Sequence, residues 1–337
     1  MPQRADCVPD MPTRRHLLAL SAAALAASGG AVRAVAEAIS KPVHIIVGFP
    51  AGGGTDVIAR ILAERLRGSY AQTILVESKP GAAARLAAEY VKNAEADGSV
   101  MLFTPDFPMT LYPASFRSLN YDPLSDFAPV SPAAKSMLAY NIGPAVPDHV
   151  RTVADFMRWC KANPGKATYA TTAAGGTPHF VGVMLANTAG VAMTPVHYRG
   201  GAPALQDLLG GHVPASVNPV SEVLPFAKSG TVRVLAVTGA RRSPFLPDVP
   251  TMTEAGYDVV VESWLGVFVP AKTPAHVVDA LSSAIGEAVK SPQMIENLAK
   301  AGNEPAFQAP ATFAATVASD LARWQPVVKA SGFVAED

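Results

Sequence analysis

The chain has 337 residues, with 27 basic and 27 acidic side chains that give a formal net charge of zero. No run or patch of basic residues stands out, so neither nucleic acid nor a charged membrane surface is expected as a partner. About 300 residues exceed what one hydrophobic core comfortably supports, and two domains are therefore expected.

The N-terminus has the features of an export signal over residues 1–38. Arg14 and Arg15 precede a mild apolar run at 17–27, and small residues at alternate positions before Ile39 offer cleavage sites. Paired arginines are typical of a twin-arginine signal, although a Sec signal contains the same parts. The apolar run is shorter than the roughly 20 residues that a membrane helix needs. We therefore expect a periplasmic, exported protein whose mature chain begins near Ile39.

A glycine-rich loop follows the first expected strand and leads directly into a helix. Gly52, Gly53 and Gly54 let the backbone approach a ligand closely, and the first N–H groups of the helix lack intrahelical partners. The loop is therefore expected to bind an anion. A phosphate-binding P-loop would need a Lys after Gly54, and a dinucleotide fingerprint would need a third glycine where Val57 stands. A simple tight turn between strand and helix is the remaining alternative.

Strand and helix patterns alternate almost throughout, which predicts an α/β fold of two lobes with mainly parallel sheets. The chain is expected to cross to the second lobe near 136–142 and to return on a long strand at 259–269. Two crossings make a two-strand hinge, which lets a clamshell close on a ligand. Lobe 1 then comprises residues 39–140 and 264–337, and lobe 2 comprises residues 141–263. The other strands are expected at 43–49, 73–77, 100–103, 167–172, 194–198, 213–217 and 233–238, and the helices at 55–66, 82–93, 153–162, 177–188, 202–209, 222–228, 275–290, 292–301 and 311–329.

A second glycine loop precedes the helix expected at 177–188. Gly175 and Gly176 follow a β-rich run, while Thr177 suits the N-cap and Pro178 the first helical position. In open α/β sheets the binding crevice lies beyond the carboxyl ends of the strands, where both glycine loops fall. We therefore expect the two lobes to hold one small anion between these loops.

The sequence contains no signature of catalysis or of metal binding. Neither a Gly-x-Ser-x-Gly elbow nor a His-Glu-x-x-His motif is present. The histidines are too scattered for a metal site, and Cys160 is the one cysteine that follows the export signal. We expect no catalytic residue, no cofactor and no metal ion.

Side chains near the loops leave several roles open. His179 can face the crevice or cap the helix start by hydrogen bonding. Asp56 lies in the first turn of a helix, where an acidic residue is stabilising without any ligand, so a structural role is expected for its side chain. Asn218 ends a strand and is expected to contact the ligand. Arg85 and Arg199 are candidate partners for a carboxylate.

Several segments spread along the chain form a specific set. They are FPAGGGTD at 49–56, YDP at 121–123 with DF at 126–127, YRGGAPAL at 198–205 with DLLGGH at 207–212, and LPDVPT at 246–251. Together these segments resemble the Bug-type solute receptors of tripartite tricarboxylate transporters, over nearly the whole mature chain. The resemblance implies a periplasmic, type II periplasmic-binding-protein-like clamshell, in which the two loops hold one ligand carboxylate and the far end of the pocket sets specificity.

The chain also departs from the pattern of this family. It has Ala83, Ala84 and Arg85 where the family commonly has two glycines and an Asn. It has Asn218 where many members carry an Asp that can meet a ligand amine, and Val183 where a Glu is common, so an amino-acid ligand such as aspartate is less expected. The ligand contacts that the resemblance implies are Phe49, Gly52, Gly53, Thr55 and Asp56 from lobe 1, and Gly175, Gly176, Thr177 and His179 from lobe 2.

These features predict a periplasmic solute-binding receptor and not an enzyme. We expect a monomer that captures a small organic carboxylate between its lobes and delivers it to the membrane subunits of a tripartite transporter. A ligand-binding subunit of a membrane sensor protein is an alternative, because transport and sensing use the same clamshell. An exported hydrolase is a further alternative.

Overall fold

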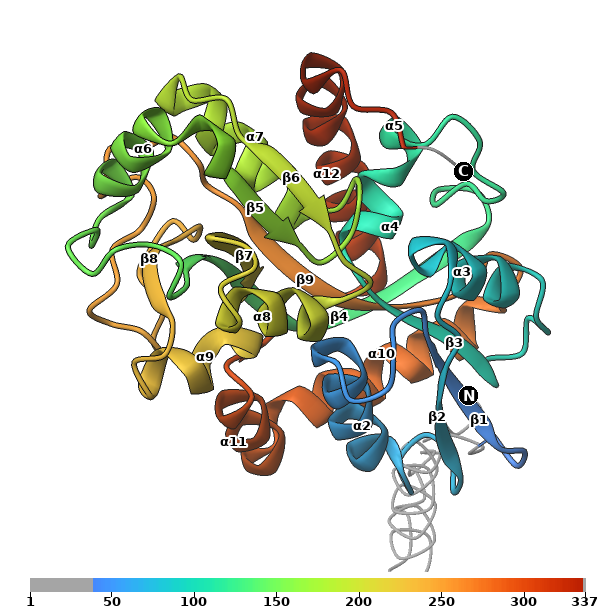
Figure 1. The fold of residues 1–337 in the computed structure, drawn as a ribbon. Helices are drawn as coiled ribbons and strands as arrows, with labels where there is room; N and C mark the ends of the chain where they lie inside the picture. Colours follow the sequence, from blue (N-terminus) through green and yellow to red (C-terminus); the bar gives the residue numbers. More distant parts are fainter. Residues whose placement is uncertain (1–38, 336–337) are drawn as a thin grey trace, which may run out of the picture. The chain divides into compact units, whose positions relative to one another are not determined.

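The computed structural model describes residues 39–335 of the chain. The export signal predicted for residues 1–38 lies outside the described residues. From Ile39 onward strands and helices alternate, and Figure 1 shows helices on both sides of the central strands. Within this part of the chain no helix is long and apolar enough to cross a membrane.

The first group of strands is parallel. β1 (Val43–Val47) lies between β2 (Ile74–Ser78) and β3 (Val100–Pro105), and its sequence VHIIV is rich in the β-branched residues that favour strands. Helices α2 (Gly54–Leu66) and α3 (Arg85–Lys92) provide the connections that parallel strands require. The buried face of α2 packs on this sheet with the apolar spacing of an amphipathic helix, through Ile58, Leu62 and Leu66.

The second group of strands repeats this arrangement. β5 (Thr168–Thr171) lies between β6 (Thr194–His197) and β7 (Ala215–Pro219), and all three run parallel. The hydrophobic core of this half includes the aromatic side chains of Tyr140, Phe156 and Phe180. The helices of this half are α6 (Val153–Ala162), α7 (Thr177–Ala189), α8 (Gly201–Leu209) and α9 (Val220–Lys228), and β8 (Arg233–Val237) follows them.

Two long antiparallel strands connect the halves. β4 (Phe127–Ile142) pairs with β9 (Glu262–Pro270) as far as Met137 and Glu262, and from Leu138 onward β4 pairs with β7 and β8 instead. Figure 1 shows β4 and β9 running together through the centre of the fold. The outer strands of each half are parallel, as predicted, whereas these two must be antiparallel because one leaves the first half and the other returns to it. The order along the main path of the sheet is β2-β1-β3-β9-β4-β7-β5-β6.

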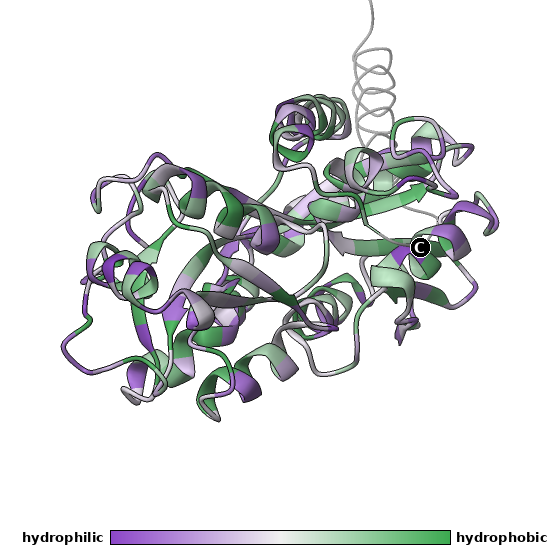
Figure 2. Ribbon diagram, turned by 45° about the horizontal axis from the view of Figure 1, so that its top comes forward, coloured by the Kyte–Doolittle hydropathy of each residue, from purple (hydrophilic) through white to green (hydrophobic). Residues whose placement is uncertain are grey.

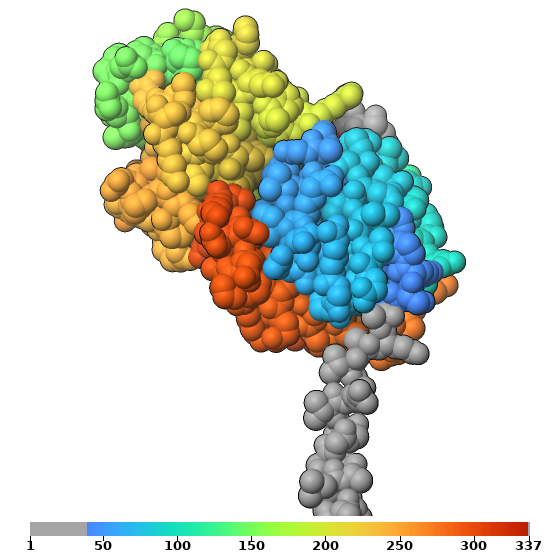
Figure 3. All heavy atoms as spheres, turned by 90° about the horizontal axis from the view of Figure 1, so that it is seen from below, coloured from blue at the N-terminus to red at the C-terminus, as the bar shows by residue number. Residues whose placement is uncertain are grey.

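C-terminal helices complete the first half and reach the second. α10 (Ala275–Lys290) and α11 (Pro292–Lys300) both pack against α2, and Figure 3 shows the surface of α11 beside that of α2. Trp324 of α12 (Pro310–Ser331) belongs to the same core cluster as Phe180 of α7. The described core is therefore continuous from α12 into the second half, and Figure 2 shows hydrophobic colour concentrated along the central strands.

Some local expectations were wrong. The helix expected at 82–93 begins only at Arg85, because Ala82, Ala83 and Ala84 form a left-handed turn with φ of 45°, 55° and 73°. The part of β4 before residue 136 was not predicted, because Pro129 and Pro132 are unusual inside a strand. Register shifts in the β4–β9 pairing accompany these prolines. Two short helices, α4 (Phe107–Thr110) and α5 (Tyr112–Ser115), and the short strand β10 (Glu304–Pro305) were also missed.

Candidate ligand-binding site

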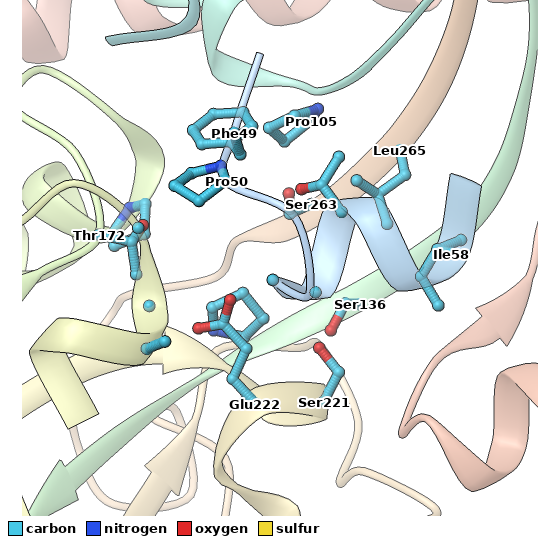
Figure 4. A pocket seen from close by; sticks show the side chains of 18 of the residues that line it. Phe49, Pro50, Ile58, Pro105, Ser136, Thr172, Ser221, Glu222, Ser263 and Leu265 are labelled. Atoms are coloured by element: carbon cyan, nitrogen blue, oxygen red, sulfur yellow. The ribbon is translucent and has the colours of Figure 1, made fainter. Parts of the chain in front are cut away.

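A cavity of about 230 Å³ lies where the two halves meet (Figure 4). Its wall includes the loop after β1 and the first turn of α2, the start of α7, the starts of α8 and α9, and both crossing strands. Hydroxyl groups are frequent in this wall, whereas Arg199 and Glu222 are the charged side chains among its described residues. The residues with hydroxyl groups are Thr55, Ser136, Thr172, Thr177, Ser221 and Ser263.

The first glycine loop is held by Asp56. Gly52 has φ of +80°, which suits glycine, and its N–H donates to Asp56 Oδ2 at 2.9 Å. Arg60 donates to both oxygens of the same carboxylate at 2.9 and 3.0 Å. Burial opposes ionisation of Asp56, but the hydrogen bonds from Arg60 and Gly52 outweigh it and lower the pKa of this carboxyl. The Asp56 side chain therefore stabilises the loop through its hydrogen bond with Gly52, which agrees with the structural role expected for it.

The second glycine loop leads into Thr177, which lies in the cavity wall. Its hydroxyl donates to Asp106 Oδ2 at 2.8 Å, and the hydroxyl of Ser263 donates to Asp106 Oδ1 at 2.6 Å. Asp106 is buried, and burial raises its pKa to about 6 although both hydroxyls favour the charged form. Gly176, and not Thr177 as predicted, is the N-cap residue of α7. The carboxylate of Asp106 thus already accepts a hydrogen bond from the Thr177 hydroxyl, which was expected to cap the helix or to contact the ligand.

His179 supports the second loop from behind. Its Nδ1 accepts a hydrogen bond from the N–H of Gly175 at 3.3 Å, and its ring contacts Phe180, His197 and Phe333. Burial, together with the proximity of His197, lowers the pKa of His179 to about 3. The imidazole is therefore neutral at physiological pH and acts here as a hydrogen-bond acceptor.

Glu222 enters the wall from the first turn of α9. Asn218 Nδ2 donates to Glu222 Oε2 at 3.1 Å, and the N–H of Gly54 also favours the charged carboxylate. A Cβ atom at Gly201 would lie only 1.7 Å from Glu222 Oε2, and a Cβ at Gly54 would lie 3.2 Å from Oε1. Burial raises the pKa of Glu222. This carboxylate consequently lies beside the N-termini of both α2 and α8, where positive helix dipoles attract it.

The structure brings half of the predicted contact residues to this cavity. Arg199 lies in its wall and also in that of a neighbouring cavity of about 990 Å³, which Arg85 lines. Arg85 donates to the carbonyl oxygens of Ala82 and Ser118. The predicted residues in the first cavity are Phe49, Gly52, Gly53, Thr55 and Thr177, whereas Asp56, Gly175, Gly176, His179 and Asn218 are outside its described lining.

The sequence interpretation missed several lining residues. Ser263 and Asn303 come from the returning part of the chain, and no local motif marks them. Glu222 did have a local signal, because it is an acidic residue in the first turn of a helix that directly follows a strand. Among the described residues no group of three or more His, Cys, Asp or Glu side chains is placed to hold a metal ion.

Known proteins share this sequence and this fold. Residues 58–333 match the receptor family of tripartite tricarboxylate transporters, TctC. BugT of Bordetella pertussis is 32% identical over 320 residues, which cover 94% of this chain and 98% of BugT.

Two solved structures are similar in the same way. Rpa4515 of R. palustris with adipate is 31% identical, with a TM-score of 0.83 and coverage of 87% of this chain and 98% of that one. MatC of Rhodopseudomonas palustris with bound malate is 27% identical, with a TM-score of 0.78 and coverage of 85% and 98%. These matches confirm the predicted two-lobed α/β clamshell, and they are to solute-binding proteins rather than enzymes. The chain therefore belongs to the TctC receptor family of tripartite tricarboxylate transporters, whose Bug-type members it resembles.

Proposed function

We propose that this protein is exported to the periplasm, captures a small organic carboxylate in the described cavity and delivers it to the membrane subunits of a tripartite transporter. The observation that carries this proposal is that three helices, α2, α7 and α8, begin at the cavity wall, while the carboxylate of Glu222 accepts a hydrogen bond from the N–H of Gly54 in α2. The first N–H groups of each helix lack intrahelical partners and lie at the positive end of its dipole. Arg199 adds a cation to the same wall.

The ligand class is supported by chemistry and by similar proteins. The structures of Rpa4515 and MatC hold adipate and malate, respectively. Hydrogen bonds to a charged group contribute roughly 1.5–3 kcal/mol each, so three or four of them account for much of the roughly −8 kcal/mol of a micromolar complex. A carboxylate therefore needs no metal ion to bind here with useful affinity.

A thermal-shift screen of the purified protein tests the ligand class. The screen includes mono-, di- and tricarboxylates, aromatic acids, neutral sugars, simple amines and inorganic cations. A ligand at about 100 times its Kd stabilises the folded state by about 2.7 kcal/mol, which such a screen detects. We expect the strongest stabilisation from an organic acid. A neutral sugar or an inorganic cation at the top of the ranking would refute the proposal.

A matched pair of variants tests the location. Thr55→Val removes a hydroxyl from the cavity wall, while Thr188→Val removes an exposed hydroxyl on the far end of α7. Loss of one hydrogen bond should weaken binding of the best acid by roughly tenfold in Thr55→Val. Calorimetric titration should give the native affinity for Thr188→Val. Equal affinities of both variants would place the ligand elsewhere.

Delivery and export need separate tests. Deletion of the gene should abolish cellular uptake of the identified acid, and a plasmid copy should restore it. Unchanged uptake together with a lost transcriptional response to that acid would favour the sensory alternative. N-terminal sequencing of the periplasmic protein should begin near Ile39, and uncleaved protein in the cytoplasmic membrane would contradict export.

A further inference from the structure

Two glycines, Gly201 and Gly54, leave room for the Glu222 carboxylate at the cavity wall. Its Oε2 atom occupies space that any side chain at Gly201 would need, since a Cβ there would lie 1.7 Å away. Its Oε1 atom lies 3.2 Å from the position of a Cβ at Gly54. Figure 4 shows the side chain extending into the pocket, on the same side as Ser221. The backbone at both helix starts is thus shaped to receive this acid.

Much of the hydrogen-bonding capacity of this carboxylate is unused. Two ionised oxygens can accept about four hydrogen bonds. The polar partners of Glu222 in the described structure are Asn218 Nδ2 and the N–H of Gly54, and within residues 39–335 no Lys, Arg or His forms an ion pair with it. A half-buried carboxylate with spare acceptor capacity and no cation is costly unless a further donor reaches it.

A ligand that displaces solvent from this cavity has to supply this donor itself, because the carboxylate otherwise loses the hydrogen bonds that water provides. Glu222 and Arg199 are the charged side chains in the described lining of the cavity, and they have opposite signs. An unsubstituted dicarboxylate would bring one of its own negative charges near Glu222, whereas an acid with an amine or hydroxyl group would complete the hydrogen bonding.

We propose that Glu222 determines specificity by selecting organic acids that carry a hydrogen-bond donor, a protonated amine most favourably and a hydroxyl group next. This inference rests on the proposed function, because the acid group of the ligand is bound by the helix N-termini. Asn218 acts through Glu222 and is a positioning residue. The chain thus has Asn218 where many members of the family carry an Asp, and an acidic side chain four residues later, at Glu222.

Matched acids provide the test. The probes are acids of increasing chain length in three forms, namely unsubstituted, hydroxylated and aminated, with the substituent at either end of the chain. Succinate, malate and aspartate are one such set, and butyrate and 4-aminobutyrate are another. The wild-type protein should bind the aminated member of at least one set roughly tenfold or more tightly than the unsubstituted member, because a hydrogen bond to a charged group is lost without the donor.

Variants assign the preference to Glu222. Glu222→Gln keeps the shape and removes the charge, so the preference for the amine should fall by about tenfold while the unsubstituted acid binds at least as well. Glu222→Ser provides a second, smaller replacement if the glutamine variant does not fold. Glu287→Gln, an exposed acid on α10, is the control and should keep the wild-type preference.

The outcomes separate this inference from the proposed function. Acids that bind the wild-type protein with equal affinity in all three forms would overturn the role of Glu222 and leave a carboxylate receptor standing. An amine preference that survives in both Glu222→Gln and Glu222→Ser would also overturn it. Failure of every acid to bind would refute the proposed function itself, and the inference with it.

Discussion

Replacement of Gly201 by Ala tests the packing that places Glu222 in the cavity. The φ angle of Gly201 is outside the left-handed range, so alanine introduces no backbone strain. The new Cβ would lie 1.7 Å from Glu222 Oε2 and 2.2 Å from its carboxyl carbon, far inside contact distance. Because the carboxylate ends a flexible side chain, it should move while α8 stays in place.

The size of the effect follows from the contacts that Glu222 loses. Moving the carboxylate breaks two hydrogen bonds, one from Asn218 and one from the N–H of Gly54. Each contributes roughly 1.5–3 kcal/mol when the acceptor is charged. Rehydration of the carboxylate and the better helix propensity of alanine offset much of this loss. We expect a net destabilisation of about 1–2 kcal/mol, which lowers the Tm by roughly 2–3 °C in a folded chain of about 300 residues.

A double-mutant cycle isolates this contact. Gly201→Ala should cost almost nothing when Glu222 is already serine, so the coupling free energy between the two positions should be about 1–2 kcal/mol. Thermal and urea unfolding of the wild type, both single variants and the double variant provide the four values. Equal costs of Gly201→Ala in both backgrounds would show that Glu222 does not occupy the space beside α8, which would contradict its proposed role in the cavity.

Three other predictions concern the loops and the buried acid. Gly53→Val places a side chain in the cavity wall and should abolish ligand binding in a calorimetric titration while the Tm stays near the wild-type value; native affinity would exclude the first loop from the site. Ala82→Gly relieves a left-handed φ of 45° at an exposed position and should raise the free energy of unfolding by about 1 kcal/mol, and no gain in urea unfolding would argue against strain there. Asp106 has its pKa raised from 3.8 to about 6, so its protonation stabilises the folded state fully below about pH 4 and this contribution is lost as the pH rises through 6. Relative to Asp106→Asn, the wild type should lose about 3 kcal/mol between pH 4 and pH 7, and parallel pH profiles of the two proteins would contradict the raised pKa.

The sequence alone determined the alternation of strands and helices and the location of the first loop. These features are local, because the β-branched run of β1, the three glycines and the apolar face of α2 follow one another within two dozen residues. The helix at Val153–Ala162 was predicted with its bounds, and the structure shows a capping box of Thr152 and Asp155 at its start. The left-handed turn at Ala82 was missed because tertiary contacts impose on alanine a conformation that its intrinsic preference opposes.

The tertiary structure alone decided which charged groups meet at the site. Asp106 lies 71 residues from Thr177 and 157 residues from Ser263, yet it accepts a hydrogen bond from each. The carboxylate of Glu222 lies between helix starts that no local pattern connects. Helix N-termini that attract a ligand anion attract the protein's own carboxylates for the same electrostatic reason. Sequence reasoning could therefore locate the positive helix ends, whereas the anions that approach them depend on the distant chain segments that the fold brings together.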